Sequence, residues 1–509
     1  GKVGRRQNNG VFLYKNRLKA GFLFYFLYFG CYYNLYFYFY KHMSLIKSIS
    51  GIRGTIGGLP GDNLTPIDVL SFVLAFSHQL KNKFSEIKNP QVVLGRDGRK
   101  SGALLYEFVR SSLCFSGINV VDVGLATTPT VEMIVIEHKA QGGIVLSASH
   151  NPRHWNALKL LNEKGEFLET SEAQELIELV EKKHLKFSEL DDLGACKEYP
   201  QALGDHIQAI KELKLVDVAA IKKRNFKIVV DGINSVGALA VPELLKSLGV
   251  ENVEVINSEI NGEFAHNPEP LDENLIGVKK KVKDSGADLG IVVDPDVDRL
   301  AFINEKGEMF GEEYTLVTVA DYVLKNYCTC FYQKISVSNL SSSRALKDIT
   351  EQKGGAYYAA AVGEVNVVAK MKETKAVIGG EGNGGIIYPE LHYGRDALVG
   401  IALFLSFLAQ EKESASNLKK RYPQYEMIKD KIELKVDTDV KLILEKIKQH
   451  YHQEKITDID GVKIDWDDSW LHLRASNTEP IIRIYVEAKT KEQATIKITE
   501  FKNFLADIK

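Results

Sequence analysis

Beyond Met43 the chain alternates short runs of β-branched and aliphatic residues with longer stretches in which apolar positions recur at helical spacing. The short runs predict buried strands, and the longer stretches predict helices with one buried face. Strands that alternate with helices build largely parallel sheets covered by helices. The pattern therefore predicts an α/β fold with mixed, mostly parallel sheets.

Three stretches repeat one order of elements. Each begins with a strand that runs into a polar turn, at 91–102, 226–237 and 334–346. Each later has a strand that ends in a loop of unusual composition, at 144–152, 289–299 and 376–385. We expect three similar α/β domains, with these loops beyond the carboxyl ends of strands, where open α/β sheets bind ligands.

The pattern changes from about residue 428. Strand-like runs at 432–436, 462–468, 470–476 and 481–489 accompany a helical stretch at 441–453, which predicts a smaller C-terminal α+β domain with an antiparallel sheet. The expected domains are residues 43–200, 201–306, 307–424 and 425–509.

Residues 1–42 differ from the remainder. The run at 21–40 matches the roughly 20 apolar residues of a membrane-spanning helix, so an anchor is one interpretation. It consists mainly of Tyr and Phe, however, and Tyr prefers the membrane interface. No small-residue cleavage site of a signal peptide follows it. We interpret residues 1–42 as a non-native or disordered extension, with the native start at Met43.

Charge and cysteine content argue against several classes of partner and site. The formal net charge is -2, but the seven bases of residues 1–42 leave 58 bases against 67 acids in the rest, which argues against nucleic acid as a partner. Five cysteines, of which only Cys328 and Cys330 are close together, form neither a disulfide framework nor a four-ligand zinc site. A cytoplasmic protein without a membrane partner is expected, unless residues 21–40 are genuine.

The loop after the strand at 289–293 carries Asp294, Asp296 and Asp298. Three carboxylates this close repel one another unless a cation neutralises them, and oxygen ligands without His or Cys favour magnesium or calcium over zinc. An acidic surface turn is the alternative. The apolar strand that leads into the loop and the rigid Pro295 favour the metal site.

Ser149 follows another apolar strand, within Ser-Ala-Ser-His-Asn-Pro, beside His150 and ahead of Lys159. A serine nucleophile needs a base, a metal or cations nearby. The chain has neither a Gly-x-Ser-x-Gly elbow nor a Gly-x-x-x-x-Gly-Lys-Ser loop, which lowers hydrolase and nucleoside-triphosphatase interpretations. Taken alone, this loop is equally compatible with a Ser or Asx turn without function.

Two further loops carry polar groups suited to a phosphosugar. The turn at 474–483 combines arginines with hydroxyls and backbone amides, which together form a phosphate clamp, although a surface turn with an ion pair from Glu479 is the alternative. Its candidate ligands are Arg474, Ser476, Asn477, Thr478 and Arg483. The glycine-rich loop at 379–385 has Glu381 as its only charge and lets the backbone approach a ligand.

Together, the Ser-His-Asn-Pro, Asp-x-Asp-x-Asp-Arg and Arg-x-Ser-Asn-Thr-Glu-Pro loops resemble the α-D-phosphohexomutase superfamily over nearly all of residues 43–509. The chain as a whole resembles bacterial phosphoglucosamine mutases. The resemblance implies four domains around a central cleft. It also implies one Mg²⁺ per chain, held by Asp294, Asp296, Asp298 and a phosphorylated Ser149. A hexose 1,6-bisphosphate would be the intermediate and activator, in a monomer or homodimer.

The resemblance also assigns roles to the other loops. The residues expected to line the reacting phosphate are Arg53, His150, Lys159 and Arg299. Glu381, with Asn383, would contact sugar hydroxyls, and the turn at 474–483 would hold the phosphate that is not transferred. Such roles fit phosphoryl transfer, which depends on positioning and charge stabilisation.

The sequence departs from the family pattern at two places. Ala157 stands where the family has a glycine before Lys159, and Gly385 stands where many members have a histidine. The second departure leaves the sugar open. We expect conversion of glucosamine 6-phosphate to the 1-phosphate for amino-sugar nucleotide and cell-wall precursor synthesis, with phosphomannomutase or phosphoglucomutase activity as the alternative. A non-catalytic sugar-phosphate-binding regulator is an alternative of a different class.

Overall fold

The computed structural model describes residues 44–48, 51–182, 186–327, 333–433, 439–475 and 481–508. The predicted extension and the predicted start at Met43 lie outside these residues. Among the helices that the structure describes, none combines the length and apolar character needed to cross a membrane.

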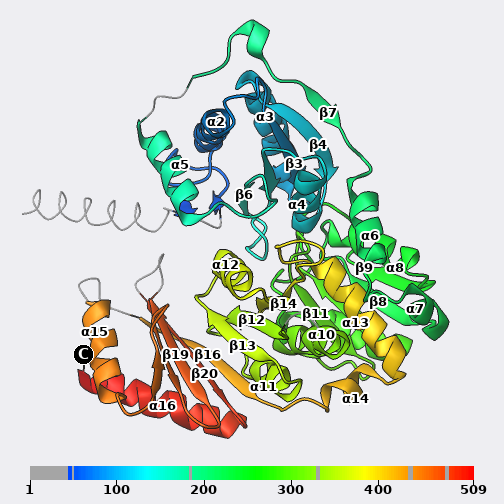
Figure 1. Cartoon of the computed structure of the whole chain (residues 1–509), viewed down its shortest axis with the longest axis vertical. Helices are drawn as coiled ribbons and strands as arrows, with labels where there is room; N and C mark the ends of the chain where they lie inside the picture. Colours follow the sequence, from blue (N-terminus) through cyan, green and yellow to red (C-terminus); the bar gives the residue numbers. More distant parts are fainter. Residues whose placement is uncertain are drawn as a thin grey trace, which may run out of the picture.

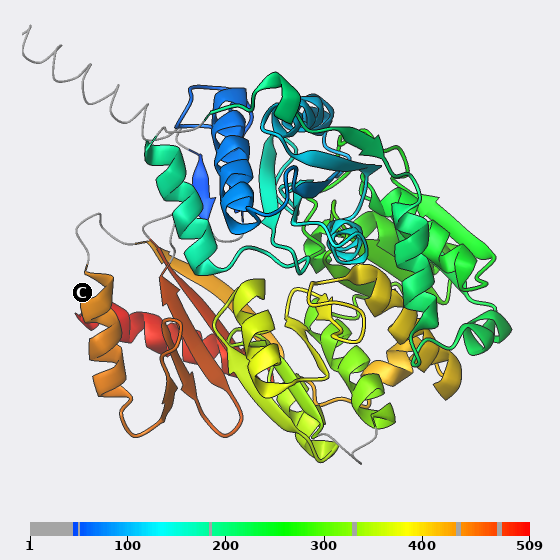
Figure 2. The same ribbon diagram turned by 45° about the horizontal axis from the view of Figure 1, so that its top comes forward.

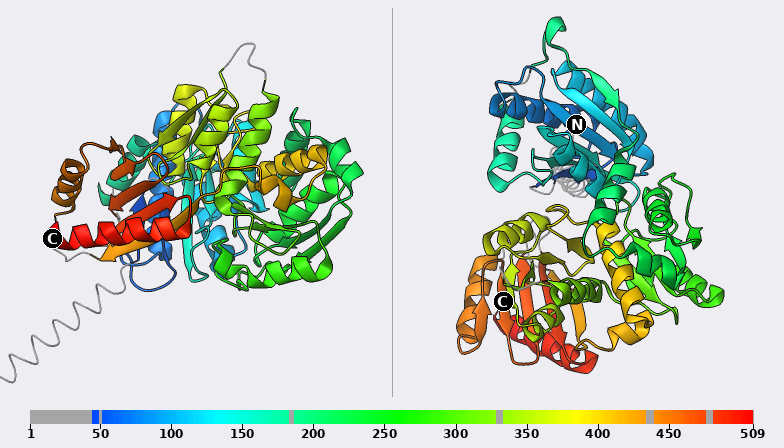
Figure 3. Two further views of the ribbon diagram at one scale, coloured as in Figure 1. Left: turned by 90° about the horizontal axis from the view of Figure 1, so that it is seen from below. Right: turned by 45° about the vertical axis from the view of Figure 1, so that its right-hand side comes forward.

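The described chain forms four sheets, each in its own domain, and the domains follow one another in an arc (Figures 1 and 3). The sheet of the C-terminal domain lies beside the third domain (Figure 1). This arrangement confirms the predicted fold class of three α/β domains and a smaller α+β domain.

The first domain has a sheet in the order β1-β2-β6-β5-β3-β4-β7, in which β3, β4, β5 and β7 are parallel. Helices α2, α3 and α5 cover one face, where α2 lies beside α5 (Figure 2), and α4 covers the other. The strands are β1 (Ile46–Ser48), β2 (Gly51–Thr55), β3 (Gln91–Arg96), β4 (Asn119–Leu125), β5 (Gly142–Leu146), β6 (Trp155–Leu161) and β7 (Cys196–Glu198). The helices are α2 (Pro66–Lys83), α3 (Lys100–Phe115), α4 (Thr128–Glu137), α5 (Thr170–Lys182) and the short η1 (Leu190–Asp192).

The second and third sheets, β11-β10-β8-β9 and β15-β14-β12-β13, have the same topology as β6-β5-β3-β4 of the first. In each, three parallel strands are followed by a fourth that returns antiparallel to the third. The strands are β8 (Lys227–Asp231), β9 (Asn252–Ile256), β10 (Leu289–Val293), β11 (Leu300–Asn304), β12 (Ile335–Asn339), β13 (Ala356–Ala360), β14 (Ile378–Glu381) and β15 (Gly385–Ile387). The predicted repeat is therefore confirmed.

The helices between the second and third sheets share one hydrophobic core, which joins the two domains. Residues 397–409 of α13 are buried throughout, because this helix packs against α6, α7 and α10. The helices of this region are α6 (Ala202–Glu212), α7 (Val218–Arg224), α8 (Gly237–Ser247), η2 (Asp272–Asn274), α9 (Ile276–Ser285), α10 (Glu312–Asn326), α11 (Ala345–Gln352), α12 (Glu364–Thr374), α13 (Ala397–Glu411) and α14 (Ala415–Lys419).

The C-terminal domain is an antiparallel sheet in the order β16-β20-β19-β18-β17 with two helices, as predicted. Its apolar side chains form a separate core. The strands are β16 (Glu426–Glu433), β17 (Lys455–Thr457), β18 (Val462–Asp465), β19 (Trp470–Ala475) and β20 (Ile481–Ala488), and the helices are α15 (Val440–His450) and α16 (Lys491–Ile508).

Candidate active site

Ser149 lies in the connection between β5 and β6, at the carboxyl end of the parallel strands. Its side chain is 5% exposed, and its Oγ donates a hydrogen bond to Asp294 Oδ2 over 2.5 Å. Its φ of 48° is in the left-handed region, which non-glycine residues seldom adopt and which is common at functional sites. The fold thus brings the predicted nucleophile into contact with the predicted metal loop.

Arg99, which the sequence analysis did not single out, holds the Ser149 loop through hydrogen bonds to its backbone. Its fully buried guanidinium pairs with Asp97 at 3.0 Å. It also donates to four backbone carbonyls of this loop, those of Ser149, Asn151, Pro152 and Trp155. An arginine has enough N–H groups to satisfy all of these acceptors at once, so one side chain fixes the path of the loop.

The aspartates of the loop between β10 and β11 are buried, at 0 to 1% exposure, and one carboxylate oxygen from each falls within 4.8 Å of the others. Asp294 Oδ1 accepts the backbone N–H groups of Asp298 and Arg299, which folds the loop back on itself. Val297 has a φ of 64°, an outlier for a β-branched residue. These aspartates are therefore held as a cluster and do not form an exposed acidic turn.

Charges around the aspartates are only partly balanced. Lys159 Nζ lies 2.5 Å from Asp296 Oδ2 and 3.0 Å from Asp298 Oδ2. Burial and the repulsion of Asp298 and Asp296 raise the pKa of Asp294 well above its usual value. Oδ1 of Asp296 and Oδ1 of Asp298 have no hydrogen-bond partner. A divalent cation would supply the missing positive charge and ligate these oxygens, so the donor set fits a hard metal ion.

Thr128, at the start of α4, is a second group that the sequence analysis missed. Its Oγ1 donates to Asp296 Oδ2 over 2.5 Å, and its N–H donates to the carbonyl of Asp296. The run Thr-Thr-Pro-Thr at 127–130 is a local signal for a helix start, and Thr127 caps α4, but nothing local indicates that Thr128 contacts a distant loop.

Two arginines, Arg53 and Arg299, lie near His150 of the Ser149 loop. Arg53, on β2, donates to Asn151 Oδ1 at 3.4 Å, and Arg299 pairs with Glu269 at 3.2 Å. Burial and the charge of Arg299 lower the pKa of Arg53, and burial with both guanidiniums lowers the pKa of His150 well below its usual value. His150 is therefore neutral at pH 7. The positive charge beside it comes from the two arginines, and this charge suits a phosphate.

Arg395 connects the metal loop to the glycine-rich loop, and sequence reasoning missed it entirely. Its guanidinium lies 2.8 Å from Asp298 Oδ2, 2.7 Å from Glu381 Oε2 and 3.0 Å from Glu364 Oε2. Glu381, at the end of β14, also accepts from Asn339 Nδ2 and the N–H of Gly363. Glu381 is thus held rigidly, 4% exposed, one arginine away from the aspartate cluster.

The structure shows what surrounds Gly385 and Ala157, the two positions that depart from the family pattern. A Cβ at Gly385 would lie 2.3 Å from Cδ of Arg395, so the stem of Arg395 fills the space of a side chain at this position. Asn383 Oδ1 accepts the N–H of Gly385 at 3.1 Å and so shapes the loop internally. Ala157 pairs with Arg53 across β6 and β2 and is buried, and this leaves Lys159 on β6 facing the aspartates.

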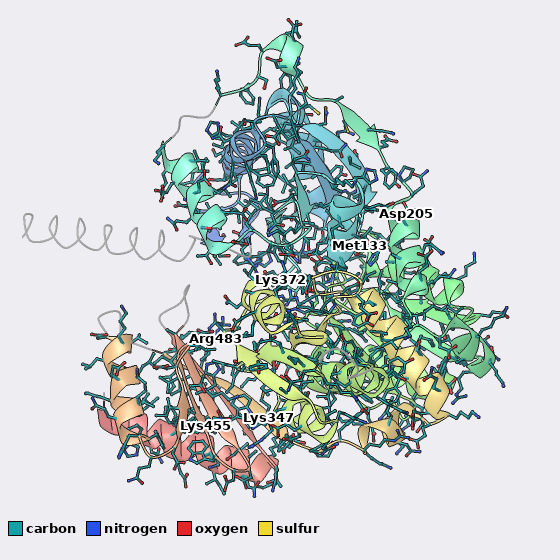
Figure 4. The ribbon with its side chains drawn as sticks, in the orientation of Figure 1. Met133, Asp205, Lys347, Lys372, Lys455 and Arg483 are labelled. Atoms are coloured by element: carbon teal, nitrogen blue, oxygen red, sulfur yellow. The ribbon has the colours of Figure 1, made fainter. Side chains whose placement is uncertain are left out.

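The structure describes only part of the predicted phosphate clamp. Arg474 on β19 and Arg483 on β20 are direct cross-strand partners, and Arg474 pairs with Asp460 at 2.9 Å. Arg483 is exposed at the end of the sheet that faces the first domain (Figure 4). Ser476, Asn477 and Thr478 lie outside the described residues.

A cavity of about 750 Å³ lies between the first and third domains. It is lined by side chains from the segment 166–174, by residues of α12 and by Tyr393, with Lys372 facing the first domain (Figure 4). Its volume falls within the roughly 300 to 1,000 Å³ of small-molecule sites. Glu364, which lines it, pairs with Arg395, and Ser149 does not line it.

Comparison with known proteins covers most of the chain. Family models described as phosphoglucomutase/phosphomannomutase, alpha/beta/alpha domains I, II and III, match residues 45–186, 204–307 and 312–425, and the model of the C-terminal domain matches residues 432–497.

Individual relatives align over nearly their whole length. The chain is 37% identical to a phosphoglucomutase/phosphomannomutase of Thermococcus kodakarensis, over 87% of this chain and 95% of that protein. It is 32% identical to a phosphoglucosamine/phosphogalactosamine mutase of Sulfurisphaera tokodaii, over 91% and 99%. A crystal structure of a phosphoglucomutase/phosphomannomutase family protein from Burkholderia thailandensis superposes with a TM-score of 0.76 at 25% identity, over 90% of this chain and 97% of that one.

Proposed function

The chain belongs to the α-D-phosphohexomutase superfamily, enzymes that move a phosphate within a sugar, and we propose that it converts glucosamine 6-phosphate to glucosamine 1-phosphate through a phosphorylated Ser149. Membership in a family of enzymes sets aside the non-catalytic regulator.

The contact between Ser149 Oγ and Asp294 Oδ2 carries the mechanism. In the proposed cycle, a sugar hydroxyl attacks the phosphorus on Ser149, the bond to Ser149 Oγ breaks, the hydroxyl proton passes to Ser149 Oγ, and a hexose bisphosphate forms. The bisphosphate turns round, Ser149 Oγ attacks its other phosphorus, and the bond from that phosphorus to the sugar oxygen breaks as the proton returns to this oxygen. The serine is restored as phosphoserine, and the isomeric monophosphate leaves.

The residues around Ser149 supply charge and position for this transfer. Asp294, Asp296 and Asp298 would hold Mg²⁺ together with an oxygen of the serine phosphate, and the ion would neutralise charge on the phosphoryl oxygens. Arg53 and Arg299 would bind the reacting phosphate, and His150 would donate a hydrogen bond without adding charge. The ammonium of Lys159 contacts Asp296 and Asp298 and so offsets part of the negative charge of the cluster.

The choice of glucosamine rests on the relatives. The name of the Sulfurisphaera tokodaii relative points to an amino sugar. A phosphoglucomutase or phosphomannomutase is the second candidate, because the Thermococcus kodakarensis relative carries that name at 37% identity.

The test is a panel of glucosamine, glucose and mannose 6-phosphates, compared by kcat/KM with the matching bisphosphate in excess. The proposal expects glucosamine 6-phosphate to exceed both others by at least about tenfold, or roughly 1.4 kcal/mol in transition-state binding. A preference for glucose or mannose 6-phosphate would select the second candidate. Absence of turnover with all three, by a protein shown to carry phosphoserine, would contradict both.

A further inference from the structure

Two buried histidines and two buried carboxylates meet where the first domain joins the rest of the chain. His206 lies on α6, His392 and Asp396 lie in the loop that leads into α13, and Glu132 lies on α4. Each is at most 4% exposed. Figure 4 shows Met133 and Asp205, the chain neighbours of Glu132 and His206, on helices at this junction, and α6 packs against both α4 and α13.

The imidazole rings converge on one oxygen. Nε2 of His206 lies 3.0 Å from Asp396 Oδ2, and Nε2 of His392 lies 3.5 Å from the same atom. The other carboxylate oxygen of Asp396 is occupied, because it accepts the N–H groups of Leu398 and Val399 as the N-cap of α13. Asp396 therefore presents one fixed oxygen to both rings.

The far side of each ring also faces a polar group. His206 Nδ1 lies 3.0 Å from Thr130 Oγ1, and His392 Nδ1 lies 3.4 Å from Glu132 Oε2. Neither His392 Nδ1 nor Glu132 Oε2 has a hydrogen-bond partner, although both are buried. Buried polar atoms without partners are costly, and a proton on His392 Nδ1 would satisfy both atoms and leave His392 Nε2 free as a ligand.

We propose that His206 Nε2, His392 Nε2 and Asp396 Oδ2 bind a divalent transition-metal ion of the zinc type, at a site separate from the aspartate cluster. Tetrahedral zinc with bonds of about 2.0 to 2.1 Å requires ligand atoms roughly 3.3 to 3.5 Å apart. The two distances to Asp396 Oδ2 bracket this range. Two imidazoles favour zinc over magnesium or calcium, which prefer oxygen.

Metal binding would also satisfy the atoms that now lack partners. A ligated His392 Nε2 carries no proton, so the ring proton resides on Nδ1, where it can be donated to Glu132 Oε2. His206 Nδ1 would donate to Thr130 Oγ1 in the same way. A carboxylate or hydroxyl behind each ligating histidine is the usual arrangement around zinc. Three protein ligands leave the fourth position for water.

The site would connect three parts of the molecule. Its ligands and their supports come from α4 of the first domain, from α6 and from the loop before α13. Asp396 directly follows Arg395, which contacts Asp298, Glu381 and Glu364. An ion at this junction would therefore fix the backbone that positions Arg395 between the metal loop and the glycine-rich loop.

The experiment uses the full chain, stripped with a chelator and then kept in excess Mg²⁺. Zn²⁺ is added, and the amount retained after desalting is measured by elemental analysis for wild type, His206→Gln, His392→Gln and Glu132→Gln. His266→Gln is the matched control, because His266 pairs with one carboxylate, Asp231, and belongs to no such cluster among the described residues. Asp296→Asn tests independence from the aspartate cluster.

The proposal expects one equivalent of zinc in wild type, His266→Gln and Asp296→Asn, and binding at least about tenfold weaker in the other three variants. Retention of no zinc by wild type, or equal retention by folded His206→Gln and His392→Gln, would overturn it. Should those variants fail to fold, X-ray absorption of zinc-loaded wild type decides. Two imidazole ligands are expected, and a shell of oxygen neighbours alone would refute the site.

Discussion

Ser149 Oγ and Asp294 Oδ2 lie 2.5 Å apart, although 145 residues separate them in the sequence. Each follows the third parallel strand of its repeat, so the same local topology, used twice, brings a hydroxyl against a carboxylate. Positive φ values at Ser149 and Val297 occur in these same two loops. Strained backbone in both loops indicates that the contact is maintained by the surrounding structure.

Ser149→Ala is expected to remove mutase activity, because it deletes the proposed phosphoryl carrier while leaving the buried loop supported by Arg99. Intact-mass measurement should find one phosphate on wild type and none on the variant. Ser71→Ala, on the exposed face of α2, serves as the control and should retain both phosphate and activity. Turnover by Ser149→Ala close to that of wild type would contradict the mechanism.

Asp296→Asn should raise the Mg²⁺ concentration needed for activity by at least about tenfold, because it removes one anionic ligand from a hard-ion site. Activity is measured across a magnesium titration, with Asp191→Asn, an exposed acidic residue, as the control. A magnesium dependence that stays unchanged in Asp296→Asn would mean that the aspartates stabilise the fold and do not bind the metal ion.

Arg395→Ala should lower the free energy of unfolding by about 3 to 5 kcal/mol, because it leaves buried carboxylates without their partner. Arg421→Ala is the matched control. Arg421 also pairs with two carboxylates, Glu411 and Glu413, but its side chain is 37% exposed, and such pairs contribute about 0 to 1 kcal/mol. Urea unfolding of the three proteins makes the comparison, and equal losses would show that Arg395 is not a structural link.

The sequence predicted the three repeats and their loops because strand runs and polar turns are local signals. Arg395 was missed because its partners lie in three separate segments, and only the fold brings Asp298, Glu381 and Glu364 together. Arg99 was missed for a related reason. It donates to backbone carbonyls of a distant loop. Every residue has such a carbonyl, so residue types do not indicate which ones a side chain contacts.

His266→Gln should destabilise the protein more at pH 6 than at pH 9. Burial opposes protonation of His266, but the hydrogen bond and charge of Asp231 outweigh it and raise the pKa of His266 above its unfolded value. A raised pKa in the folded state stabilises it fully below the unfolded pKa of about 6.5, and this stabilisation disappears as the pH rises through the folded pKa. Unfolding midpoints of wild type and variant at both pH values measure the effect, and a difference independent of pH would contradict it.

The cross-strand pair Arg474 and Arg483 gives the last prediction. Two like charges directly opposite each other on neighbouring strands are destabilising unless an anion lies between them. Asp460 neutralises Arg474 at 2.9 Å, whereas Arg483 is exposed. A sugar phosphate that binds both arginines would complete this pair. The clamp must also accept either end of the sugar, because the bisphosphate turns round within the cycle.

Binding of the unreactive phosphate would align the sugar hydroxyl with the phosphoserine, so part of its energy should appear in kcat. Arg474→Ala should therefore raise KM and lower kcat, with a combined loss on the order of 2 to 4 kcal/mol. Arg474→Lys should recover only part of this loss, because an ammonium lacks the planar fork of donors. Steady-state kinetics with excess bisphosphate separates these effects from loss of the serine phosphate. Changes below about twofold in both constants, roughly 0.4 kcal/mol, would mean that Arg474 only pairs with Asp460 within the C-terminal domain and does not bind the substrate.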